Sequence, residues 1–335
     1  MIERILIVGL GSIGKRHLRI ARGQNPNADI RVLRHQKCSY IPEYSSGCFS
    51  TTEEALVFKP QLAVIANPAT FHMSIAQSLA EIGTHLLIEK PLSVTIDGVE
   101  HLIETCHKNK INLLIGYNLR FLPSLNKYRE LLKENKIGKV FSVRCEIGQY
   151  LPTWRPGSNY KNSVSARKEL GGGALFELSH EIDYLRWIFG EIDWVKATLS
   201  NQSNLEVNVE DSAHLILGFE TLNESDKQLI GTLNIDFIRH DKTRLCTAIG
   251  ETGSLRWDGV SGKIEFYGEN ATDWTVICEY EQQRDETYIS EWEHFLDCVR
   301  NQKQPVISGV DGLMALNIIN AARQSSNCEH IKIIK

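Results

Sequence analysis

A glycine-rich segment near the N-terminus constrains the fold more than any other part of the sequence. It reads Gly-Leu-Gly-Ser-Ile-Gly over residues 9–14, which is a G-x-G-x-x-G pattern. The apolar run Ile5–Val8 before it is typical of a buried parallel strand, and Ser12–Arg22 is expected to be helical. This strand–turn–helix context predicts a dinucleotide-binding unit. A glycine-rich turn that binds no ligand is the alternative.

The residues of this motif have separate physical tasks in such a unit. Gly9 allows the tight turn, Gly11 lets the backbone approach a pyrophosphate, and Gly14 lets helix and strand pack closely. Ser12 and Ile13 begin the helix, where free N–H groups and the positive end of the helix dipole favour phosphate.

Alternating strand and helix signals continue over residues 1–120. Further strands are expected at Ile30–Leu33, Leu62–Ala66, His85–Ile88 and Ile111–Ile115. The helices between them are expected at Glu53–Phe58, after a Thr51/Glu54 capping box, and at Phe71–Ile82 and Thr95–Asn109. This rhythm predicts an α/β Rossmann domain with a doubly wound parallel sheet.

The pattern changes over residues 121–335, where we expect an α+β domain for substrate binding and oligomerisation. Strand signals dominate Ile192–Ile277 and predict a large, mostly antiparallel open sheet with helices on one face. The other expected elements are a helix at Ser124–Asn135, a strand at Lys139–Gln149, a loop at Leu151–Glu169, and helices within Leu170–Phe189, at Glu286–Asn301 and at Val310–Ser325, the last of which packs back toward the first domain.

Composition excludes several classes of function. A length of 335 residues suggests two domains, and a net charge of −4 argues against a general nucleic-acid binder. No apolar run approaches the roughly 18 residues of a membrane span, and the N-terminus lacks the pattern of a signal peptide, so we expect a cytoplasmic protein. The eight cysteines and eleven histidines are dispersed, which favours reduced thiols over disulfides and indicates no metal site.

The end of the second strand bears on the choice between NAD and NADP. An acidic residue there would hold the ribose 2′-hydroxyl, but the sequence has Arg34 and His35, followed by Lys37. A guanidinium suits the geometry of a 2′-phosphate, so NADP(H) is favoured over NAD(H). The alternative is that Arg34 is simply an exposed residue at the end of a strand.

Two other segments carry candidate chemistry. Glu89-Lys90-Pro91 follows the fourth strand, and ligands of open α/β sheets bind outside the carboxyl ends of strands. A glycine triplet at 171–173 precedes Glu177, His180 and Asp183, whose spacing of three predicts one shared helical face. A histidine flanked by two carboxylates in this way favours function over packing, although a lone helical histidine is more often structural.

Together with the glycine motif and the stretch 116–121, these segments resemble the Gfo/Idh/MocA family, named for glucose–fructose oxidoreductase and inositol dehydrogenase. The resemblance covers nearly the whole chain. It implies a Rossmann domain followed by an α/β domain whose open sheet forms a homodimer or homotetramer. It also implies that the protein oxidises or reduces a hydroxyl or carbonyl group of a sugar, a cyclitol or a related molecule.

The resemblance further implies roles for individual residues. Lys90 matches the family's catalytic lysine, which would stabilise charge on the reacting oxygen, and His180 matches the catalytic histidine, which would exchange its proton. Glu177 stands where many members have aspartate, at a spacing one residue shorter, and Asp183 either orients the histidine or packs locally. The resemblance adds Glu89, Asn67 and Pro68 to the cofactor site. Tyr117, Asn118 and Arg120 follow the fifth strand and are expected to face the substrate cleft, with packing at the domain joint as the alternative for Tyr117 and Phe121.

The loop at 150–168 predicts the kind of substrate. Trp154 can stack on a sugar or a base, and Arg155 can pair with phosphate or carboxylate. We therefore expect an anionic sugar, such as a sugar nucleotide; a solvated loop at an oligomer interface is the alternative. The loop and the stretch 178–184 also resemble family members of bacterial surface-glycan metabolism, and this resemblance implies such a pathway. The sequence leaves two other functions open, a hydrolase or isomerase of the same fold with a tightly bound cofactor, and a non-catalytic dinucleotide sensor.

Overall fold

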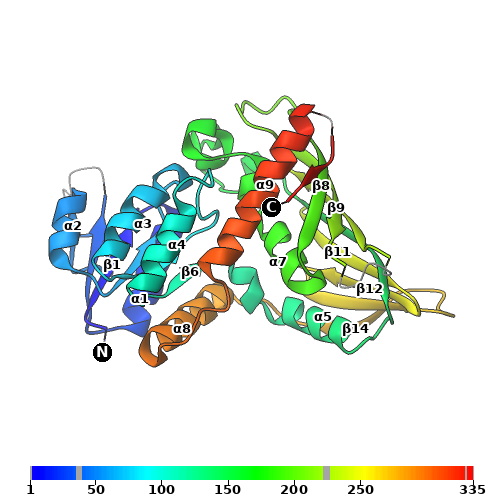
Figure 1. Cartoon of the computed structure of the whole chain (residues 1–335), viewed down its shortest axis with the longest axis horizontal. Helices are drawn as coiled ribbons and strands as arrows, with labels where there is room; N and C mark the ends of the chain where they lie inside the picture. The colour runs from blue at the N-terminus through cyan, green and yellow to red at the C-terminus, as the bar shows by residue number, and fades with distance from the viewer. Residues whose placement is uncertain (1, 35–39, 222–226, 329, 335) are drawn as a thin grey trace. The chain divides into compact units, whose positions relative to one another are not determined.

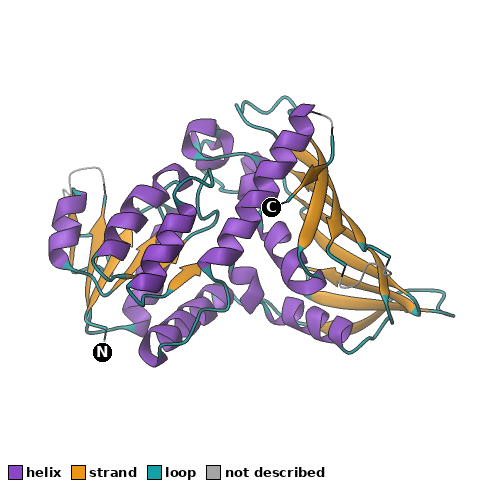
Figure 2. Ribbon diagram, in the orientation of Figure 1, coloured by secondary structure: helices purple, strands orange, loops and turns teal. Residues whose placement is uncertain are grey.

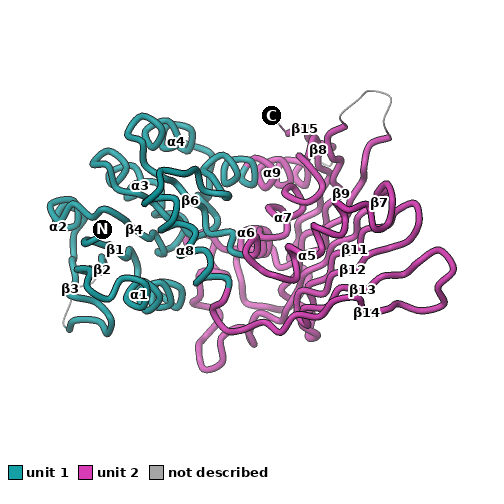
Figure 3. The backbone as a smooth tube through the Cα atoms, turned by 90° about the horizontal axis from the view of Figure 1, so that it is seen from below, with its two compact units in different colours: residues 1–118, 287–316 teal, residues 119–286, 317–335 magenta. Residues whose placement is uncertain are grey.

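The computed structural model describes residues 2–34, 40–221, 227–328 and 330–334. The chain divides into two compact units (Figure 3). The first unit holds residues 1–118 together with 287–316, and the second holds residues 119–286 together with 317–335. The first unit therefore adds a segment from near the C-terminus to the stretch over which the strand–helix rhythm was recognised.

The first unit is a Rossmann domain, as predicted. Its six strands are all parallel and lie in the order β3-β2-β1-β4-β5-β6, which is the doubly wound arrangement. The strands are β1 (Arg4–Val8), β2 (Asp29–Leu33), β3 (Gly47–Phe49), β4 (Leu62–Ile65), β5 (His85–Ile88) and β6 (Leu113–Ile115). The helices are α1 (Ser12–Gln24), α2 (Thr52–Phe58), α3 (His72–Glu81), α4 (Val99–Lys108) and α8 (Glu286–Asn301) (Figure 1).

Local chemistry explains where these elements begin. The predicted capping box is present, because the Thr51 side chain accepts from the N–H of Glu54 while the Glu54 carboxylate accepts from the N–H of Thr51. Helix α4 begins at Val99, later than the predicted Thr95, because Gly98 before it adopts a left-handed conformation with φ of 75°. Strand β3 was not predicted, since three residues are too few for a periodic signal.

The core of the first unit lies on both faces of the parallel sheet. Strand β4 is buried along its whole length, which explains its continuous apolar sequence. On one face, Leu18 of α1 and Trp292 and Phe295 of α8 pack against Ile7 and Val64. Helices α3 and α4 pack against each other on the opposite side of the sheet (Figure 1). Helix α8 is thus part of the Rossmann core although it lies far away in the sequence.

The second unit is built on a nine-stranded sheet in the order β14-β13-β12-β11-β7-β10-β9-β8-β15 (Figure 2). The sheet is mostly antiparallel, as predicted, with one parallel pair between β7 and β10. Its strands are β7 (Val140–Gly148), β8 (Ile192–Ser200), β9 (Ser212–Phe219), β10 (Ile230–Asp236), β11 (Thr243–Gly250), β12 (Gly253–Asp258), β13 (Lys263–Gly268), β14 (Thr275–Glu279) and β15 (Lys332–Ile333).

Helices cover one face of this sheet. Tyr184 packs edge-on against Trp257 of β12, with ring centroids 5.5 Å apart, and the Ser325 hydroxyl accepts from the N–H of Ala197 in β8. The helices are α5 (Pro123–Lys133), α6 (Ala174–Glu177), α7 (His180–Phe189) and α9 (Gly309–Cys328), of which the last begins in the first unit and continues into the second.

The single helical face expected for Glu177, His180 and Asp183 is wrong in detail. Helix α6 ends at Glu177 and α7 begins at His180, with Leu178 and Ser179 between them. Leu178 has φ of −107° and ψ of 28°, which departs from helical geometry and interrupts the periodicity. The two carboxylates therefore belong to different helices, and the spacing of three does not give them a common direction.

The cysteines also depart from the sequence-based expectation at one position. Cys48 is disulfide-bonded, so the expectation of reduced thiols throughout is wrong at this residue. Spacing along the chain cannot reveal such a bond, because it depends on the distance between Cα atoms in the fold. Among the residues that the structure describes, the free thiols are Cys106, Cys145, Cys246, Cys278, Cys298 and Cys328. Within the described ranges, no helix combines the length and apolar character needed to cross a membrane.

Candidate active site

The glycine motif forms a tight turn at the carboxyl end of β1. Gly9 has φ of 89°, and a Cβ atom there would lie 2.8 Å from the backbone nitrogen of Asn67. A Cβ on Gly14 would lie 2.2 Å from the carbonyl oxygen of Gly9, so the helix can approach the turn this closely only with glycine. A Cβ on Gly11, in contrast, would have no protein atom within 4 Å. The motif therefore leaves open space beside the helix N-terminus, where Ser12 and Ile13 begin α1.

The turn after β4 lies against this glycine turn. The side-chain oxygen Oδ1 of Asn67 is buried and has no hydrogen-bond partner in the described part of the chain. Such an atom is costly unless a ligand or water completes it. Pro68 follows Asn67 and precedes the short helical turn Ala69–Phe71. The sequence-based placement of Asn67 and Pro68 beside the glycine motif thus agrees with the geometry, and the orphaned oxygen fits a bound cofactor.

His72 connects the turn after β4 to the segment that carries Lys90. Its Nε2 lies 2.8 Å from the carbonyl oxygen of Asn67, and its Nδ1 lies 3.1 Å from that of Pro91 and 3.3 Å from that of Leu92. The ring is fully buried, and burial lowers its pKa from the ordinary value. A neutral ring has one N–H, so His72 donates to the carbonyl of one of the two turns and lies against the other turn at the carboxyl edge of the sheet.

The residue before Lys90 is held by a second buried histidine. His17 of α1 lies with Nε2 2.7 Å from the carboxylate oxygen Oε1 of Glu89, and Trp292 donates from Nε1 to Nδ1 of His17 at 2.8 Å. Because Nδ1 accepts, the ring proton is on Nε2 and is donated to Glu89. The other oxygen of Glu89 accepts from the backbone N–H of Lys90 at 3.3 Å. Glu89 thus orders the lysine segment from within the core.

A second carboxyl group lies buried near Glu89 and His17. Glu291 of α8 has no exposed surface, and neither of its carboxyl oxygens has a hydrogen-bond partner in the described part of the chain. Burial first, and the charge of Glu89 second, raise the pKa of Glu291 well above its ordinary value. The raised pKa favours the neutral acid form of Glu291.

The residues expected to select the cofactor lie at the end of β2. The backbone N–H of Arg34 donates to the carbonyl oxygen of Phe49 at 3.0 Å, and its side chain is half-buried. This contact fixes Arg34 beside β3, at the same carboxyl edge as Gly9. His35 and Lys37, the other residues of this prediction, lie outside the described residues.

In the second unit, the glycine triplet packs the segment before His180 against neighbouring backbone. Gly171 and Gly173 have φ of 83° and 118°, and a Cβ on Gly172 would lie 2.2 Å from the carbonyl oxygen of Val164. The carboxylate of Glu210 accepts from the N–H of Leu175 at 3.1 Å and so helps to begin α6. The triplet therefore serves the backbone geometry that leads to α7, where His180 is the first residue and is half-buried.

Glu177 and the predicted substrate loop meet through one serine. The hydroxyl of Ser165 donates to the Glu177 carboxylate at 3.0 Å. Ser165 also lines a small hollow with Trp154 and Arg155. Trp154 is fixed there by its Nε1, which donates to the carbonyl of Gln149 at 2.9 Å, and by edge-on packing against Phe237. Arg155 is exposed, and together these contacts bring the loop to the end of the segment that contains His180.

The third residue of the acidic pattern, Asp183, forms a buried ion pair. Its two carboxylate oxygens accept from Nε and NH2 of Arg120 at 2.9 Å and 2.6 Å, and both side chains are almost fully buried. The pair joins the turn before α5 to the first turns of α7. This contact explains the fixed position of both residues and gives Arg120 a partner inside the unit, in place of the substrate contact expected from the sequence.

The other residues expected at the substrate cleft are also buried. Tyr117 has no exposed surface, and Asn118 is 5% exposed. The Asn118 amide donates to the hydroxyl of Thr287 at 2.9 Å, which ties the residue after β6 to the start of α8. This burial favours the packing alternative that the sequence left open for Tyr117.

Comparison with known proteins identifies the two halves of the chain. Residues 3–117 match the model of the oxidoreductase family GFO_IDH_MocA, described as its NAD-binding Rossmann fold, and residues 129–333 match the model of its C-terminal alpha/beta domain. The chain belongs to the Gfo/Idh/MocA oxidoreductase family. It is therefore an oxidoreductase with a nicotinamide dinucleotide domain, and the resemblance noted from the sequence is confirmed.

Individual relatives are more distant. The chain is 26% identical to YteT of Bacillus subtilis over 153 residues, which make up 46% of this chain and 35% of YteT. Levoglucosan dehydrogenase in complex with NADH has a TM-score of 0.85 at 20% identity, with 99% of each chain covered. The WlbA dehydrogenase from Bordetella pertussis, in complex with NADH and UDP-GlcNAcA, has a TM-score of 0.80 at 19% identity, with 100% of this chain and 99% of WlbA covered. At such identities the two structures support the fold alone.

Three residues that position the candidate active site could not be predicted from the sequence. His17, Trp292 and Ser165 hold Glu89 and Glu177, although no motif marks them. His17 lies three residues after Gly14 on the buried side of α1, which is the single sequence signal that it faces the sheet. Trp292 is fully buried, and nothing in the sequence indicates that its indole N–H donates to His17. Such partners become visible only once distant segments are folded together.

Proposed function

We propose that this protein oxidises or reduces a hydroxyl or carbonyl group of a sugar or sugar derivative, with a nicotinamide cofactor bound at the carboxyl edge of the Rossmann sheet. The observation that carries the proposal is the combination of the open space at Gly11 with the orphaned Asn67 oxygen beside it. Both lie at the edge where Lys90 follows β5. When bound, the nicotinamide would supply or accept the hydride.

The protein's own residues would handle the proton and the charge. We assign to Lys90 a hydrogen bond to the reacting oxygen, where its ammonium group stabilises developing negative charge. His180, half-buried at the start of α7, would take the hydroxyl proton during oxidation and return it during reduction. Glu177, held by Ser165, and Asp183, held by Arg120, would keep the backbone around His180 in place.

The two catalytic assignments are tested with variants that keep the size of the side chain. Lys90→Met and His180→Gln are each expected to keep NADH affinity within a few-fold while turnover falls by about 10² or more. Lys108→Met is the matched control for the lysine, because Lys108 is exposed at the end of α4. Turnover at the wild-type rate in either active-site variant would remove that residue from the mechanism.

For the cofactor, NADP(H) is favoured over NAD(H). Arg34 lies at the carboxyl end of β2, where the residue that contacts the adenine ribose is found in such domains, and it replaces the usual carboxylate. Arg34→Leu is expected to weaken NADPH binding by about tenfold and to leave NADH binding within about twofold. Equal dissociation constants for NADPH and NADH in the wild-type protein would contradict this preference.

For the substrate, we favour an anionic sugar such as a sugar nucleotide of bacterial surface-glycan metabolism. Arg155 is exposed beside Trp154, so the loop offers one cation and one aromatic ring to a ligand. WlbA, whose fold is similar, is described in complex with UDP-GlcNAcA. A substrate panel of sugar nucleotides, sugar acids and neutral sugars tests this class, and turnover of neutral sugars alone would overturn it.

The open face of the nine-stranded sheet is our proposed homo-oligomer interface. Lys196 and Ile216 are neighbours in register on β8 and β9, as are Thr198 and His214, and all four are exposed. The helices described above pack on the other face. Light scattering of Ile216→Glu should report a smaller species than the wild-type protein, whereas identical masses would argue against this interface.

A further inference from the structure

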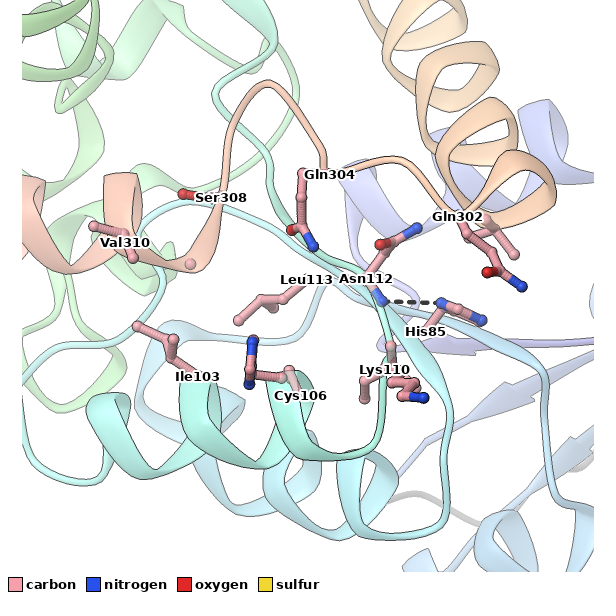
Figure 4. Close-up of a pocket in the computed structure, with 14 residues that line it drawn as sticks. His85, Ile103, Cys106, Lys110, Asn112, Leu113, Gln302, Gln304, Ser308 and Val310 are labelled. Atoms are coloured by element: carbon pink, nitrogen blue, oxygen red, sulfur yellow. Dashed lines mark hydrogen bonds between the residues drawn. The ribbon is translucent and has the colours of Figure 1, made fainter.

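The first unit contains a second hollow, at the edge of the sheet opposite to the candidate active site. It lies at the amino ends of β5 and β6, whereas the glycine motif and Lys90 lie at the carboxyl ends of their strands. Its volume is about 570 Å³, and its wall is formed by the ends of α4 and α8 and the start of α9 (Figure 4). All the residues that line it belong to the first unit.

The most informative residue of this hollow is Asn112. It is only 7% exposed, yet its side-chain amide makes no hydrogen bond within the described part of the chain. Its backbone N–H is satisfied by Nδ1 of His85 at 3.0 Å, so the side chain alone is left open. Figure 4 shows the amide in the hollow, between the side chains of Gln302 and Gln304. The amide atoms face the open space of the hollow, where a ligand or water can complete their hydrogen bonds.

Hydrogen-bond donors and one lysine lie around this amide. Because Nδ1 of His85 accepts from the backbone N–H of Asn112, the proton of the neutral ring is on Nε2, and burial lowers the pKa of His85 and so favours the neutral ring.

 The side chains of Lys110 and His107 lie at the rim of the hollow, and neither side chain makes a hydrogen bond or an ion pair within the described residues. The fourteen lining residues include no aspartate or glutamate, so the hollow offers donors and positive charge without a competing carboxylate.

The floor of the hollow is apolar. Ile103 and Cys106 of α4, Leu113 of β6 and Val299 of α8 contribute it. Cys106 is 3% exposed, and burial raises the pKa of its thiol to about 12, so the sulfur adds apolar surface rather than charge. An apolar floor with a few converging polar groups is typical of a site for a small organic molecule, and the volume lies within the usual range for such sites.

From these observations we propose that the hollow binds a small organic anion, namely a sugar phosphate or a carboxylate of similar size. The phosphate or carboxylate group contacts Lys110, and hydroxyl groups of the ligand complete the Asn112 amide and reach Gln302. This site is separate from the proposed catalytic function, because its residues lie at the opposite edge of the sheet and none of them is assigned to catalysis.

The test uses the full-length protein saturated with NADH, so that the cofactor site is occupied and does not compete for the added anion. Glucose 6-phosphate, citrate and glucose are titrated separately, and binding is followed by calorimetry and by the NMR signals of the histidine rings. Glucose 6-phosphate or citrate is expected to bind and to shift the signals of His85 and His107, whereas uncharged glucose is not. The comparison of the two anions distinguishes a phosphate from a carboxylate ligand.

Three variants assign the binding to this hollow. Lys110→Gln is expected to weaken anion binding by about tenfold, because it removes a charge-assisted hydrogen bond. Asn112→Leu is expected to weaken it as well without lowering the melting temperature, because it replaces an unpartnered buried amide by an apolar group of similar size. Lys108→Gln removes the same charge two residues away, outside the lining, and is expected to change binding by less than about twofold.

The proposal is overturned if neither anion binds the wild-type protein at about 1 mM. It is also overturned if Lys108→Gln weakens binding as much as Lys110→Gln does, which would indicate general charge attraction. Binding that is unchanged in both Lys110→Gln and Asn112→Leu would place the anion elsewhere and would equally overturn it.

Discussion

The segments that carry Lys90 and His180 are both held in place by buried polar contacts, but the chemistry of these contacts differs. In the first unit, two buried histidines hold the turns around Lys90, since His17 donates to the Glu89 carboxylate and His72 donates to a backbone carbonyl. In the second unit, the helix that begins with His180 is anchored by a buried ion pair between Asp183 and Arg120. The Lys90 segment is thus held by imidazole hydrogen bonds, and the His180 segment is held by an ion pair.

This difference predicts how each region responds to the loss of one partner. Removing one member of a buried ion pair leaves an uncompensated charge, which is among the most costly changes in a protein core. Removing a hydrogen-bonding imidazole leaves carbonyl groups without a donor, which costs less. The region around His180 should therefore be the more fragile of the two, while the region around Lys90 should tolerate substitution and lose function first.

The largest expected effect is that of Asp183→Ala. It leaves the Arg120 guanidinium buried without its partner, and we expect the free energy of unfolding to fall by about 3–5 kcal/mol. Urea unfolding followed by circular dichroism measures the change. The double variant Asp183→Leu/Arg120→Leu removes both charges and should recover most of the loss. A single variant as stable as the wild-type protein would contradict the ion-pair account.

A smaller effect is expected for His72→Leu. The substitution keeps the ring's volume approximately but removes its N–H, which donates to one of the surrounding carbonyls of Asn67, Pro91 and Leu92, and this should cost about 1–3 kcal/mol in unfolding free energy. Because His72 holds the Asn67 turn as well as the lysine segment, NADH affinity should fall together with turnover. Unchanged NADH affinity in a destabilised variant would show that His72 serves stability alone.

Two buried tryptophans provide a matched pair for the next prediction. Trp292 donates to His17 in the first unit, and Trp257 donates to the Ser124 hydroxyl at 3.0 Å in the second. Trp292→Phe and Trp257→Phe should each cost about 1–2 kcal/mol, since each loses one buried hydrogen bond and some packing. Only Trp292→Phe should reduce turnover, through His17 and Glu89. Equal turnover in the two variants would show that the contacts from Trp292 through His17 to Glu89 do not affect the function of Lys90.

An effect of the opposite sign, a gain in stability at neutral pH, is expected for Glu291→Gln. The pKa of Glu291 is raised in the folded protein, so the folded state binds a proton that the unfolded state has released, and stability falls as pH rises above the ordinary glutamate range. Glu291→Gln should remove this dependence of stability on pH, so that the variant gains stability over the wild-type protein as pH rises.

A Glu181→Gln variant provides the contrast, because that buried carboxylate accepts from Arg244 at 2.8 Å and its loss should destabilise the protein at neutral pH. Parallel pH profiles for Glu291→Gln and the wild-type protein would refute the neutral-acid assignment.

Local signals predicted the parts of the fold that depend on neighbouring residues. The glycine motif, the Thr51 capping box and the apolar strands could be recognised because their physical causes lie within a few residues of one another. The interruption at Leu178 and Ser179 could not, since the periodicity of the apolar residues continues across it while the backbone leaves helical geometry. The three-residue strand β3 was missed for lack of length.

The supporting contacts of the site were the least predictable part. His17 and Trp292 are 275 residues apart, and Arg120 and Asp183 are 63 residues apart. The sequence could suggest that each residue was polar or aromatic and buried, but the pairing depends on how distant segments meet in the fold. For the same reason Arg120 was assigned to substrate from its motif, although its guanidinium is bound to Asp183.

The central claim, that the glycine turn holds a nicotinamide dinucleotide, is tested most directly by titrating NADH and NADPH into Gly11→Val. Gly11 has φ of −68° and an added Cβ would touch no protein atom, so valine should leave the fold and the melting temperature nearly unchanged while filling the space that a pyrophosphate needs. Gly23→Val is the control, because Gly23 in the same helix also has no atom within 4 Å of an added Cβ. Loss of binding of both cofactors in Gly11→Val, with binding retained in Gly23→Val, is the predicted result. Wild-type affinity in Gly11→Val would contradict the account.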